Sequence, residues 1–354
     1  MSPRPGHGFG RPELEAKTMN SFAIGVDLGG TNMRIAAVEP AGRQLAAICA
    51  ATDLKRGRDE ILTEICSGIR ELACRFAPDH RLVGIGVGVP GIIDLESGTV
   101  DSAANLPGWD NYPVRQELEK RLCVPVILEN DANCAAVGEQ WLGAGQGLDD
   151  LCMITLGTGV GGGFVVQGRP WHGLMGMAGE LGHMTVVPEG TPCGCGSRGC
   201  LEQYASASAI KRMALEAVAR NESPALAREA GLSSSFDAQT VFDCYRNGDA
   251  AAQAIFESAG SALGIALANL INALNLPLYV VGGGVARAWE AFSPAMFREL
   301  NRHSIVFRAG EFRKSRHKAT MVVPSNLHGS AGVLGAAHLP MLLKRPSNWR
   351  SQAV

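Results

Sequence analysis

The pattern of hydrophobic and polar residues divides the chain into short apolar stretches and segments with helical spacing. The apolar runs that predict strands are residues 22–26, 33–38, 81–89, 124–128, 153–156, 162–166 and 278–281. Residues 60–76 instead carry apolar side chains near the 3.6-residue period of a helix, at Ile61, Leu62, Ile65, Ile69, Leu72 and Ala73. Because strands and helices alternate, we expect an α/β fold in which helices cover the sheets.

The chain after residue 205 is expected to be mainly helical. The helices predicted there cover residues 207–220, 238–246, 250–274 and 330–343. The strand at residues 278–281 interrupts this region and ends at Gly282, Gly283 and Gly284, ahead of a further helix.

Two segments share one plan. Residues 22–38 and residues 151–166 each contain a strand, a glycine-rich turn, a second strand and a closing turn. The central turns are Asp-Leu-Gly-Gly-Thr at residues 27–31 and Gly-Thr-Gly at residues 157–159. We interpret this as a duplicated structural unit.

Length and charge narrow the class of protein. A chain of 354 residues is long enough that two domains are expected. With 32 Lys and Arg against 34 Asp and Glu, the net charge of −2 gives no support for a nucleic-acid-binding surface. The longest uninterrupted apolar runs are strand-length, so we expect no transmembrane helix. Residues 1–20 lack the apolar core of a secretory signal and are expected to form a disordered leader.

Ten cysteines give information on the compartment and on metal binding. The seven outside one dense cluster are expected to be buried, reduced thiols of a cytoplasmic protein, and they are Cys49, Cys66, Cys74, Cys123, Cys134, Cys152 and Cys244. The cluster contains His183, Cys193, Cys195 and Cys200, the ligand set of a closed structural zinc site. The alternative is a glycine-rich turn with ordinary reduced cysteines.

Two acidic residues lie just outside this ligand set. Glu180 precedes His183 by three positions, and Glu202 follows Cys200 by two. Their placement suggests that the metal shapes a pocket for a polyhydroxylated ligand. Loss of the metal is then expected to loosen this pocket and to leave the glycine turns near Gly29 and Gly159 largely intact.

The glycine-rich loops exclude two common nucleotide-binding motifs. Residues 86–91 and 157–162 both match G-x-G-x-x-G, but neither leads from a strand into a helix as a dinucleotide site requires. The chain also contains no G-x-x-x-x-G-K-[ST] segment. Such turns can still direct backbone N–H groups at phosphate oxygens. Plain β-hairpins are the alternative explanation.

Five motifs in order along the chain resemble those of the ROK family of sugar kinases and repressors. They are DLGGT at residues 27–31, ENDAN at 129–133, LGTGVGGG at 156–163, GELGH at 179–183 and CGCGSRGCLE at 193–202. NLPGW at residues 105–109 is similar to a segment of the family's bacterial glucokinases. About 20 residues precede the first strand, too few for the helix-turn-helix domain of the repressor members, so we expect a kinase.

The resemblance implies a two-domain actin- and hexokinase-like (ribonuclease H-like) α/β fold, with a duplicated β-sheet core and the active site in the cleft between the domains. The smaller domain is expected to comprise residues 21–130 and about 329–345. The larger domain is expected to comprise residues 131–328, including the zinc loop and the helical part. Residues 346–354 are expected to form a polar tail.

The resemblance also implies roles in phosphoryl transfer. Asp131 is the candidate general base, which accepts the proton of the attacking sugar hydroxyl. An N-cap role for the helix that starts near Ala132 is the alternative, and both roles can coexist. Asn130 is suited to reading a neighbouring hydroxyl. Asp27 is expected to organise Mg²⁺, the alternative being a turn-forming aspartate.

The remaining candidate residues fall into a sugar set and a nucleotide set. The sugar set, in addition to Asn130 and Asp131, comprises Gly91, Asn105, Glu180, His183 and Glu202. The nucleotide set, in addition to Asp27, comprises Gly29, Gly30, Thr31, Thr158, Gly159, Gly282, Gly283 and Gly284. If one ring nitrogen of His183 binds zinc, the other is free to bond the sugar. Trp109 is equally consistent with packing and with binding.

We therefore expect an ATP-dependent glucokinase that uses Mg²⁺ in the reaction and Zn²⁺ as a structural metal, and that forms glucose 6-phosphate. The alternatives are a kinase for N-acetylglucosamine, N-acetylmannosamine, allose or fructose, a sugar-responsive regulator without catalysis, and an inactive zinc-binding scaffold. Polyphosphate as phosphoryl donor also stays open. The resemblance suggests a homodimer.

Overall fold

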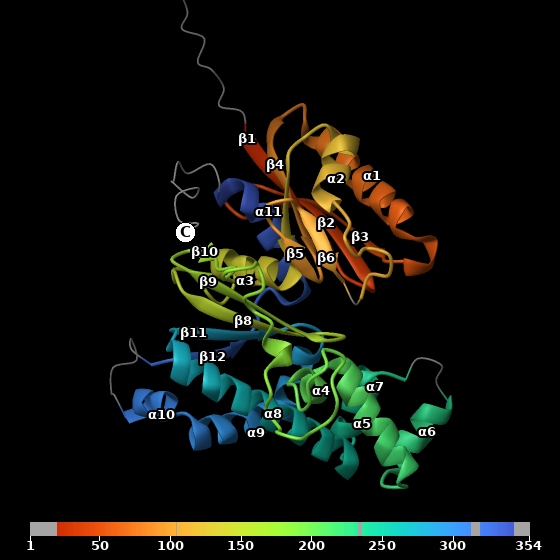
Figure 1. Ribbon diagram of the computed structural model, residues 1–354, viewed down its shortest axis with the longest axis vertical. Helices are drawn as coiled ribbons and strands as arrows, with labels where there is room; N and C mark the ends of the chain where they lie inside the picture. Colours follow the sequence, from red (N-terminus) through yellow and green to blue (C-terminus); the bar gives the residue numbers. More distant parts are fainter. Residues whose placement is uncertain (1–19, 104, 233–235, 313–318, 343–354) are drawn as a thin grey trace, which may run out of the picture.

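The computed structural model describes residues 20–103, 105–232, 236–312 and 319–342. The predicted leader, apart from Asn20, and the predicted tail lie outside these residues. Two five-stranded sheets form the framework, with helices on their faces and a two-stranded ribbon beside the first sheet. Figure 1 shows the first sheet in one half of the molecule, and the second sheet with most of the helices in the other half.

The first sheet combines antiparallel and parallel pairing. Its strands in spatial order are β3 (Gln44–Ala51), β2 (Asn32–Val38), β1 (Asn20–Leu28), β4 (His80–Val89) and β7 (Val126–Asn130). Strand β2 runs antiparallel to β1 and β3, whereas β1, β4 and β7 run parallel. Helix α1 (Arg58–Phe76) packs against this sheet and buries five of the six apolar residues that predicted it, whereas Ala73 is half-buried.

The second sheet repeats this arrangement. Its strands in spatial order are β10 (Arg169–Pro170), β9 (Val160–Val166), β8 (Leu151–Leu156), β11 (Leu278–Gly282) and β12 (Met321–Pro324). Strand β9 is antiparallel to its neighbours, and β8, β11 and β12 are parallel. The predicted duplication is therefore confirmed at the level of strand order and direction. The resulting fold is α/β and of the actin- and hexokinase-like type.

Helices α3 (Asp131–Leu142) and α11 (Ala331–Leu342) join the two sheets. They pack on each other; α11 contacts β1 and β4, and α3 contacts β8 and β9. The close approach of α11 to α3 requires glycine at position 335, because a Cβ atom on Gly335 would lie 1.7 Å from the Cys134 carbonyl oxygen. The fully buried Glu139 on α3 accepts hydrogen bonds from Ser325 Oγ at 2.5 Å and from the Leu327 N–H at 2.9 Å. Helix α3 is thereby fixed to the segment between β12 and α11.

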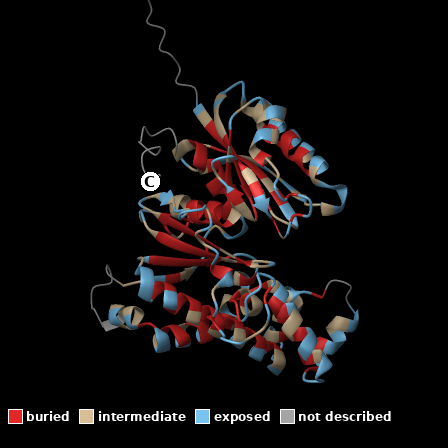
Figure 2. Ribbon diagram, in the orientation of Figure 1, coloured by how far each residue is buried: buried red, intermediate tan, exposed pale blue. Residues whose placement is uncertain are grey.

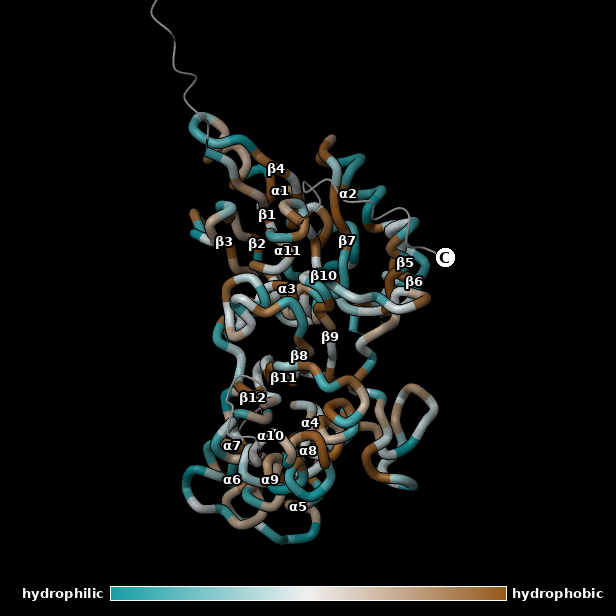
Figure 3. The backbone as a smooth tube through the Cα atoms, turned by 90° about the vertical axis from the view of Figure 1, so that its left-hand side faces the viewer, coloured by the Kyte–Doolittle hydropathy of each residue, from teal (hydrophilic) through white to brown (hydrophobic). Residues whose placement is uncertain are grey.

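A helical layer covers the other face of the second sheet. It contains α4 (Glu202–Ala205), α5 (Ala207–Ala219), α6 (Pro224–Leu232), α7 (Ala238–Arg246), α8 (Ala250–Leu274), α9 (Trp289–His303) and α10 (Ile305–Phe312). By length and composition alone α8 could cross a membrane, but 67% of its most apolar window is buried inside the protein. Figures 2 and 3 show α8 as a largely buried, hydrophobic helix of this layer, so it is a core helix.

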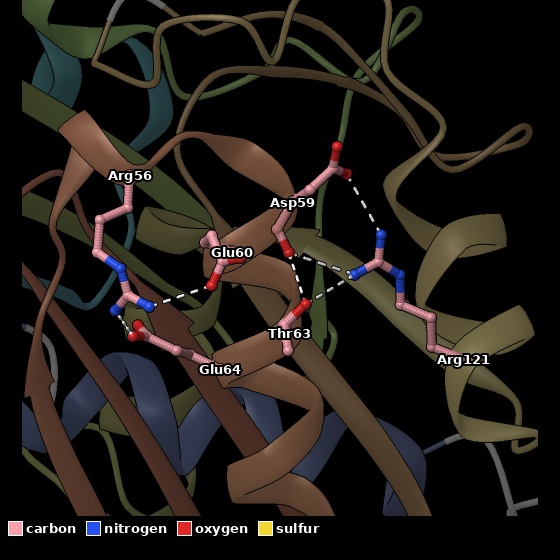
Figure 4. Close-up of polar contacts among 6 residues, drawn as sticks. All are labelled: Arg56, Asp59, Glu60, Thr63, Glu64 and Arg121. Carbon is pink, nitrogen blue, oxygen red and sulfur yellow. Dashed lines mark hydrogen bonds and ion pairs between the residues drawn. The ribbon is translucent and has the colours of Figure 1, made fainter.

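Polar side chains on the outer surface hold α1 in place. Arg56 pairs with Glu60 and Glu64, and Arg121 on α2 (Val114–Leu122) contacts Asp59 and Thr63 on α1 (Figure 4). These groups are largely exposed to water, so each pair adds little stability. They fix how α1 meets α2, and the buried face of α1 supplies the larger stabilisation.

The predicted elements match the structure with several corrections. Helices α7 and α8 have the predicted bounds. Asp27 and Leu28 were predicted in a turn but end strand β1, because their backbone pairs with Arg34 and Met33. The strands and α-helices for which the hydrophobic pattern gave no prediction are β3, the ribbon strands β5 (Ile92–Asp94) and β6 (Thr99–Ser102), β10, β12, α2, α4, α6 and α10. The exact boundaries of the two domains stay a prediction.

Two further expectations concern the scattered cysteines and Trp109. Of the seven scattered cysteines, Cys66, Cys134, Cys152 and Cys244 are buried as expected, whereas the expectation of burial is wrong for Cys49, Cys74 and Cys123, which are exposed. Trp109 is 1% exposed and packs edge-on against Tyr112, so it has a packing role.

Candidate functional site

A cavity of about 920 Å³ lies where the carboxyl ends of the parallel strands of both sheets converge. In α/β sheets this edge is the usual position for ligands. The predicted residues that line the cavity are Asp27, Gly29, Gly30, Thr31, Gly91, Asn105, Asn130, Asp131, Thr158, Gly159, Glu180, His183, Cys195, Glu202, Gly283 and Gly284. Groups from both halves of the chain, predicted separately as a sugar set and a nucleotide set, therefore share one cavity.

Asp131 lies at the first turn of α3, directly after strand β7. The N-cap of this helix is Asn130, whose Oδ1 accepts hydrogen bonds from the N–H groups of Ala132 and Asn133. The alternative in which Asp131 is the cap is therefore wrong. Asn130 Nδ2 donates to the Gly91 carbonyl at 3.2 Å, so capping and this bond engage the amide oxygen and one amide hydrogen, which leaves the second hydrogen for a hydroxyl.

The carboxyl groups of Asp131 and Asp27 both have raised pKa values. Burial raises the pKa of Asp131 from 3.8 to about 6; the hydrogen bond from the Ala132 N–H opposes this increase, and the charge of Glu180 adds to it. Burial also raises the pKa of Asp27 to about 7, where the charge of Asp131 adds to the increase and the charge of Arg34 opposes it. Asp131 is thus mostly ionised at pH 7 and basic enough to accept a proton.

We expect Asp131→Asn to stabilise the ligand-free protein at pH 8. The Asp131 carboxyl, with a pKa of about 6 in the folded state, binds its proton more tightly there than in the unfolded chain, where its pKa is 3.8. Its contribution to the free energy of unfolding is therefore fully present below pH 3.8 and is lost as the pH rises through 6. Removing the ionisable group should therefore raise the free energy of unfolding at pH 8 by about 1–2 kcal/mol, because water in the cavity screens part of the full effect.

Thermal unfolding of both proteins at pH 8 and pH 4, without nucleotide, sugar or magnesium, measures this difference. The melting temperatures should differ at pH 8 and converge at pH 4. Asp94→Asn is the control, because hydrogen bonds from Ser97 and from the Glu96 N–H lower the pKa of the exposed Asp94 carboxyl, so its replacement should not stabilise the protein. An Asp131→Asn protein no more stable than wild type at pH 8 contradicts the assignment of a raised pKa.

One side of the cavity is formed by glycine-rich strand ends. Asp27 lies against the start of α11, where a Cβ on Gly332 would lie 2.5 Å from its Oδ2 atom. Gly283 has a φ of +88°, and a Cβ there would be 2.4 Å from the Leu156 carbonyl oxygen. Both positions require glycine and bring backbone to the cavity wall. Gly282 does not line the cavity; it packs against Met153 and Ser325 at the end of β11.

Several cavity residues were not found from the sequence. Arg34 follows the first glycine turn and is the cross-strand partner of Asp27, and Arg212 comes from α5. Gly329 lies between β12 and α11, and Gly332 lies in the first turn of α11, so a strand, a glycine turn and a helix start follow one another here. That succession was the available signal, because helix starts bind anions.

The four predicted zinc ligands form one cluster. The ligand atoms of His183, Cys193, Cys195 and Cys200 all lie within 4.8 Å of one another. The Sγ atoms of Cys195 and Cys200 are 3.7 Å apart, as are Cys193 Sγ and His183 Nδ1. Two ligands about 2.3 Å from a tetrahedral zinc ion lie about 3.8 Å apart. The donor set and its spacing therefore fit a closed structural zinc site.

His183 connects this cluster with the cavity. Its Nδ1 faces Cys193, whereas its Nε2 lies 3.9 Å from Glu180 Oε2, and both residues line the cavity. A metal bound to Nδ1 leaves Nε2 as the outward ring nitrogen, as expected from the sequence. Gln203 Nε2 donates to Cys193 Sγ at 3.6 Å and so orients a second ligand.

The zinc loop also contacts the second glycine turn. Glu202 Oε2 accepts a hydrogen bond from the Val160 N–H at 2.9 Å, and Ser208 Oγ donates to the Thr158 carbonyl at 2.8 Å. The Ala207 N–H donates to the Gly157 carbonyl at 2.8 Å. The expectation that loss of metal leaves the turn near Gly159 largely intact is therefore revised, because the segment that follows the cluster holds this turn.

Comparison with known proteins identifies the family. The model of the ROK family matches residues 23–341. The chain belongs to the ROK family. A glucokinase of Halalkalibacterium halodurans is 38% identical to this ROK chain over 320 residues, which cover 89% of the chain and 94% of the relative. A glucokinase of Thermotoga maritima is 37% identical, with 89% and 96% covered.

A solved structure resembles the ROK chain over most of its length. It is a ROK family glucokinase from Streptomyces griseus in complex with glucose and AMPPNP, with a TM-score of 0.75, 35% sequence identity, and 90% of this chain and 99% of that chain covered. Family, fold and relatives together make this ROK chain a sugar kinase.

Proposed function

We propose that this kinase transfers the γ-phosphoryl group of ATP to the 6-hydroxyl of glucose. The observation that carries the proposal is the single cavity in which Asp131, ionised near neutral pH, lies between hydroxyl-binding groups and glycine-rich strand ends. Relatives named glucokinases, and the Streptomyces griseus structure with glucose and AMPPNP, support glucose and ATP as the substrates.

Asp131 acts as the general base in this proposal. Its carboxylate accepts the proton of the 6-hydroxyl as the sugar oxygen forms a bond to the γ-phosphorus and the bond from that phosphorus to the leaving ADP oxygen breaks. The Ala132 N–H fixes one carboxylate oxygen at 2.9 Å, which leaves the other oxygen available for the hydroxyl. The alignment of base and hydroxyl is the main contribution of the protein to this step.

The nucleotide lies along the glycine-rich strand ends. Backbone N–H groups at Gly29 to Thr31 and at Thr158 and Gly159 bind the phosphates, and Gly283 with Gly284 forms the wall for the adenosine. The carboxylate of Asp27, an oxygen ligand inside the cavity, suits Mg²⁺ held directly or through water. Bound magnesium supplies neutralisation of the phosphate charge.

Arg34 supplies a further positive charge at the phosphates. Four carboxylates line the cavity, at Asp27, Asp131, Glu180 and Glu202. Arg212 already bonds Glu216 and the Gln203 carbonyl, whereas Arg34 forms no hydrogen bond or ion pair with the residues that the structure describes. A polyanionic substrate among these carboxylates needs such a cation.

Arg34→Met is therefore expected to lower kcat by about 10–100-fold while the KM for glucose changes by less than about threefold, because the lost charge acts on the phosphoryl group. Steady-state kinetics with glucose and ATP varied in turn provide the measurement. The matched control is Arg43→Met, since Arg43 is exposed, pairs with Glu39 and does not line the cavity. An unchanged kcat in Arg34→Met would remove Arg34 from the phosphate site.

The sugar binds against the zinc loop. Glu180, His183 and Glu202 contact its hydroxyls from the zinc-loop side, and Gly91, Asn105 and Asn130 from the other side. Zn²⁺ held by His183, Cys193, Cys195 and Cys200 fixes the imidazole ring in the orientation that presents Nε2 to the sugar. The homodimer and the cytoplasmic location stay predictions.

A panel of sugars tests the proposed function. Production of ADP is followed in a coupled assay with glucose, N-acetylglucosamine, N-acetylmannosamine, allose and fructose as acceptors, and with ATP or polyphosphate as donor. Glucose with ATP should give the highest kcat/KM. A higher kcat/KM for another sugar would assign the kinase to that sugar, and binding without turnover of any sugar would favour a regulator.

A further inference from the structure

The carboxylate that precedes the proposed base is buried and fully engaged. Glu129 is 3% exposed and lies on β7, two residues before Asp131. Its Oε1 accepts hydrogen bonds from the Asn130 N–H at 2.9 Å and from Asn133 Nδ2 at 3.0 Å. Glu129 therefore holds the backbone before Asp131 and a side chain after it.

The other oxygen of this carboxylate contacts a different part of the chain. Glu129 Oε2 lies 2.7 Å from Nε2 of His172. His172 follows strand β10, which lies beside α3 in Figure 1. One carboxylate thus connects the Asp131 segment with residues beyond the second sheet.

The backbone of His172 is fixed on both sides. The Trp171 N–H donates to the Phe164 carbonyl on β9 at 2.9 Å, and the Ala178 N–H donates to the His172 carbonyl at 3.0 Å. Ala178 lies two residues before Glu180, on the sugar side of the cavity. A displacement of His172 is therefore expected to move the turn that carries Glu180.

The contact between Glu129 and His172 is much less exposed than the residues that follow His172. The Leu174 side chain is 97% exposed and that of Met175 is 70% exposed, whereas the His172 side chain is 31% exposed and that of Glu129 is 5% exposed. A buried carboxylate without a compensating partner is costly. Although burial lowers the pKa of His172, its bond to Glu129 leaves that pKa raised, which favours the imidazolium form.

We propose that Glu129 and His172 form a positioning pair that holds the base segment at residues 129–133 against the turn at residues 178–180, which carries Glu180. The pair touches neither the reacting atoms nor the cavity directly. It acts by keeping Asp131 and Glu180 in one fixed relative placement. This inference rests on the proposed function, since Asp131 and Glu180 matter together only if the base must meet a bound hydroxyl.

His172→Leu is expected to lower kcat by about 10–100-fold, because a displacement of about 1 Å between base and hydroxyl costs this much. The KM for ATP should change by less than about threefold, since the phosphate loops are held by other contacts. The matched control is Leu174→Ala. Leu174 lies in the loop after His172, is 97% exposed and does not line the cavity, so its replacement should leave kcat and both KM values unchanged.

Two further variants distinguish a pair from two independent structural residues. His172→Arg retains a cationic donor that suits a carboxylate and should keep kcat within about threefold of wild type. In a double-mutant cycle, Glu129→Gln combined with His172→Leu should be no slower than the slower single variant. If the decrease in kcat of the double variant is the product of the decreases in the two single variants, the proposal is overturned. A kcat in His172→Arg as low as in His172→Leu would also overturn it.

Hydrogen exchange followed by mass spectrometry tests the connection without using activity. His172→Leu should speed exchange at residues 129–134, and Glu129→Gln should speed it at residues 171–180. Faster exchange confined to the mutated segment would overturn the pairing, even in a variant with little activity. A wild-type protein that phosphorylates no sugar would instead refute the proposed function, and the exchange data would still decide whether the two segments are coupled.

Discussion

Asp131→Asn is expected to lower kcat by a factor of about 10²–10⁴, the usual contribution of a positioned general base. Asparagine keeps the shape of the side chain and the oxygen that accepts the Ala132 N–H, but it cannot take the hydroxyl proton. Glucose affinity and zinc content should be unchanged. Initial rates with ATP and saturating glucose, together with calorimetric titration by glucose, measure the two effects separately.

Retention of more than about a tenth of the wild-type kcat would remove Asp131 from the role of base. Asp79→Asn is the matched control, because Asp79 is exposed and does not line the cavity; its kcat should equal that of wild type. The same Asp131→Asn protein should be the more stable one at pH 8, so a loss of activity cannot be ascribed to unfolding.

Cys195→Ser is expected to release the metal and to lower glucose affinity by about tenfold or more, which corresponds to about 1.4 kcal/mol. Cys195 is the exposed cysteine of the cluster, so its replacement removes a ligand without disturbing a packed core. ATP affinity should also fall, but less, since Glu202 and Ser208 hold the turn at residues 157–160 from the segment that follows the cluster.

Metal analysis and calorimetric titration with glucose and with a non-hydrolysable ATP analogue provide the measurement. Wild type should contain one zinc ion per chain, and Cys195→Ser less. Cys74→Ser is the control, as Cys74 is exposed and lies outside the cluster. Loss of zinc with unchanged glucose affinity would show that the metal does not shape the sugar pocket.

Local signals in the sequence predicted much of the fold. The two strand-turn-strand units were predicted from apolar runs interrupted by glycine, and they occupy equivalent places in the two sheets. The bounds of α8 follow from a long Ala- and Leu-rich stretch with Asp249 as N-cap and Asn275 in the left-handed conformation at its end. Such elements are fixed by neighbouring residues, which is why one sequence suffices to find them.

The elements that were missed depend on contacts between distant residues. The edge strand β3 exposes every second residue and is held by pairing with β2. The mostly polar helix α2 is held by two buried residues, Val114 and Leu118. Helix α2 has no strong hydrophobic pattern of its own, whereas β3 contains the apolar run at residues 45–51, a local signal that was missed.

The same distinction applies to the site. The cysteine cluster was predicted correctly as a group because its ligands are close in the sequence. Gly332 approaches Asp27 only through the packing of α11 on the first sheet, whereas Arg34 is placed beside Asp27 by the pairing of β1 with β2. The partner of Glu129 lies 43 residues along the chain, so no local pattern indicates that His172 is involved.

The product of the reaction tests the central claim most directly. Purified protein is incubated with ¹³C-labelled glucose, ATP and Mg²⁺, and the products are followed by ¹³C and ³¹P NMR. The account predicts a phosphate ester at carbon 6 of glucose that accumulates in step with ADP and is absent with Asp131→Asn. Phosphorylation at another carbon, or release of ADP without any sugar ester, would contradict it.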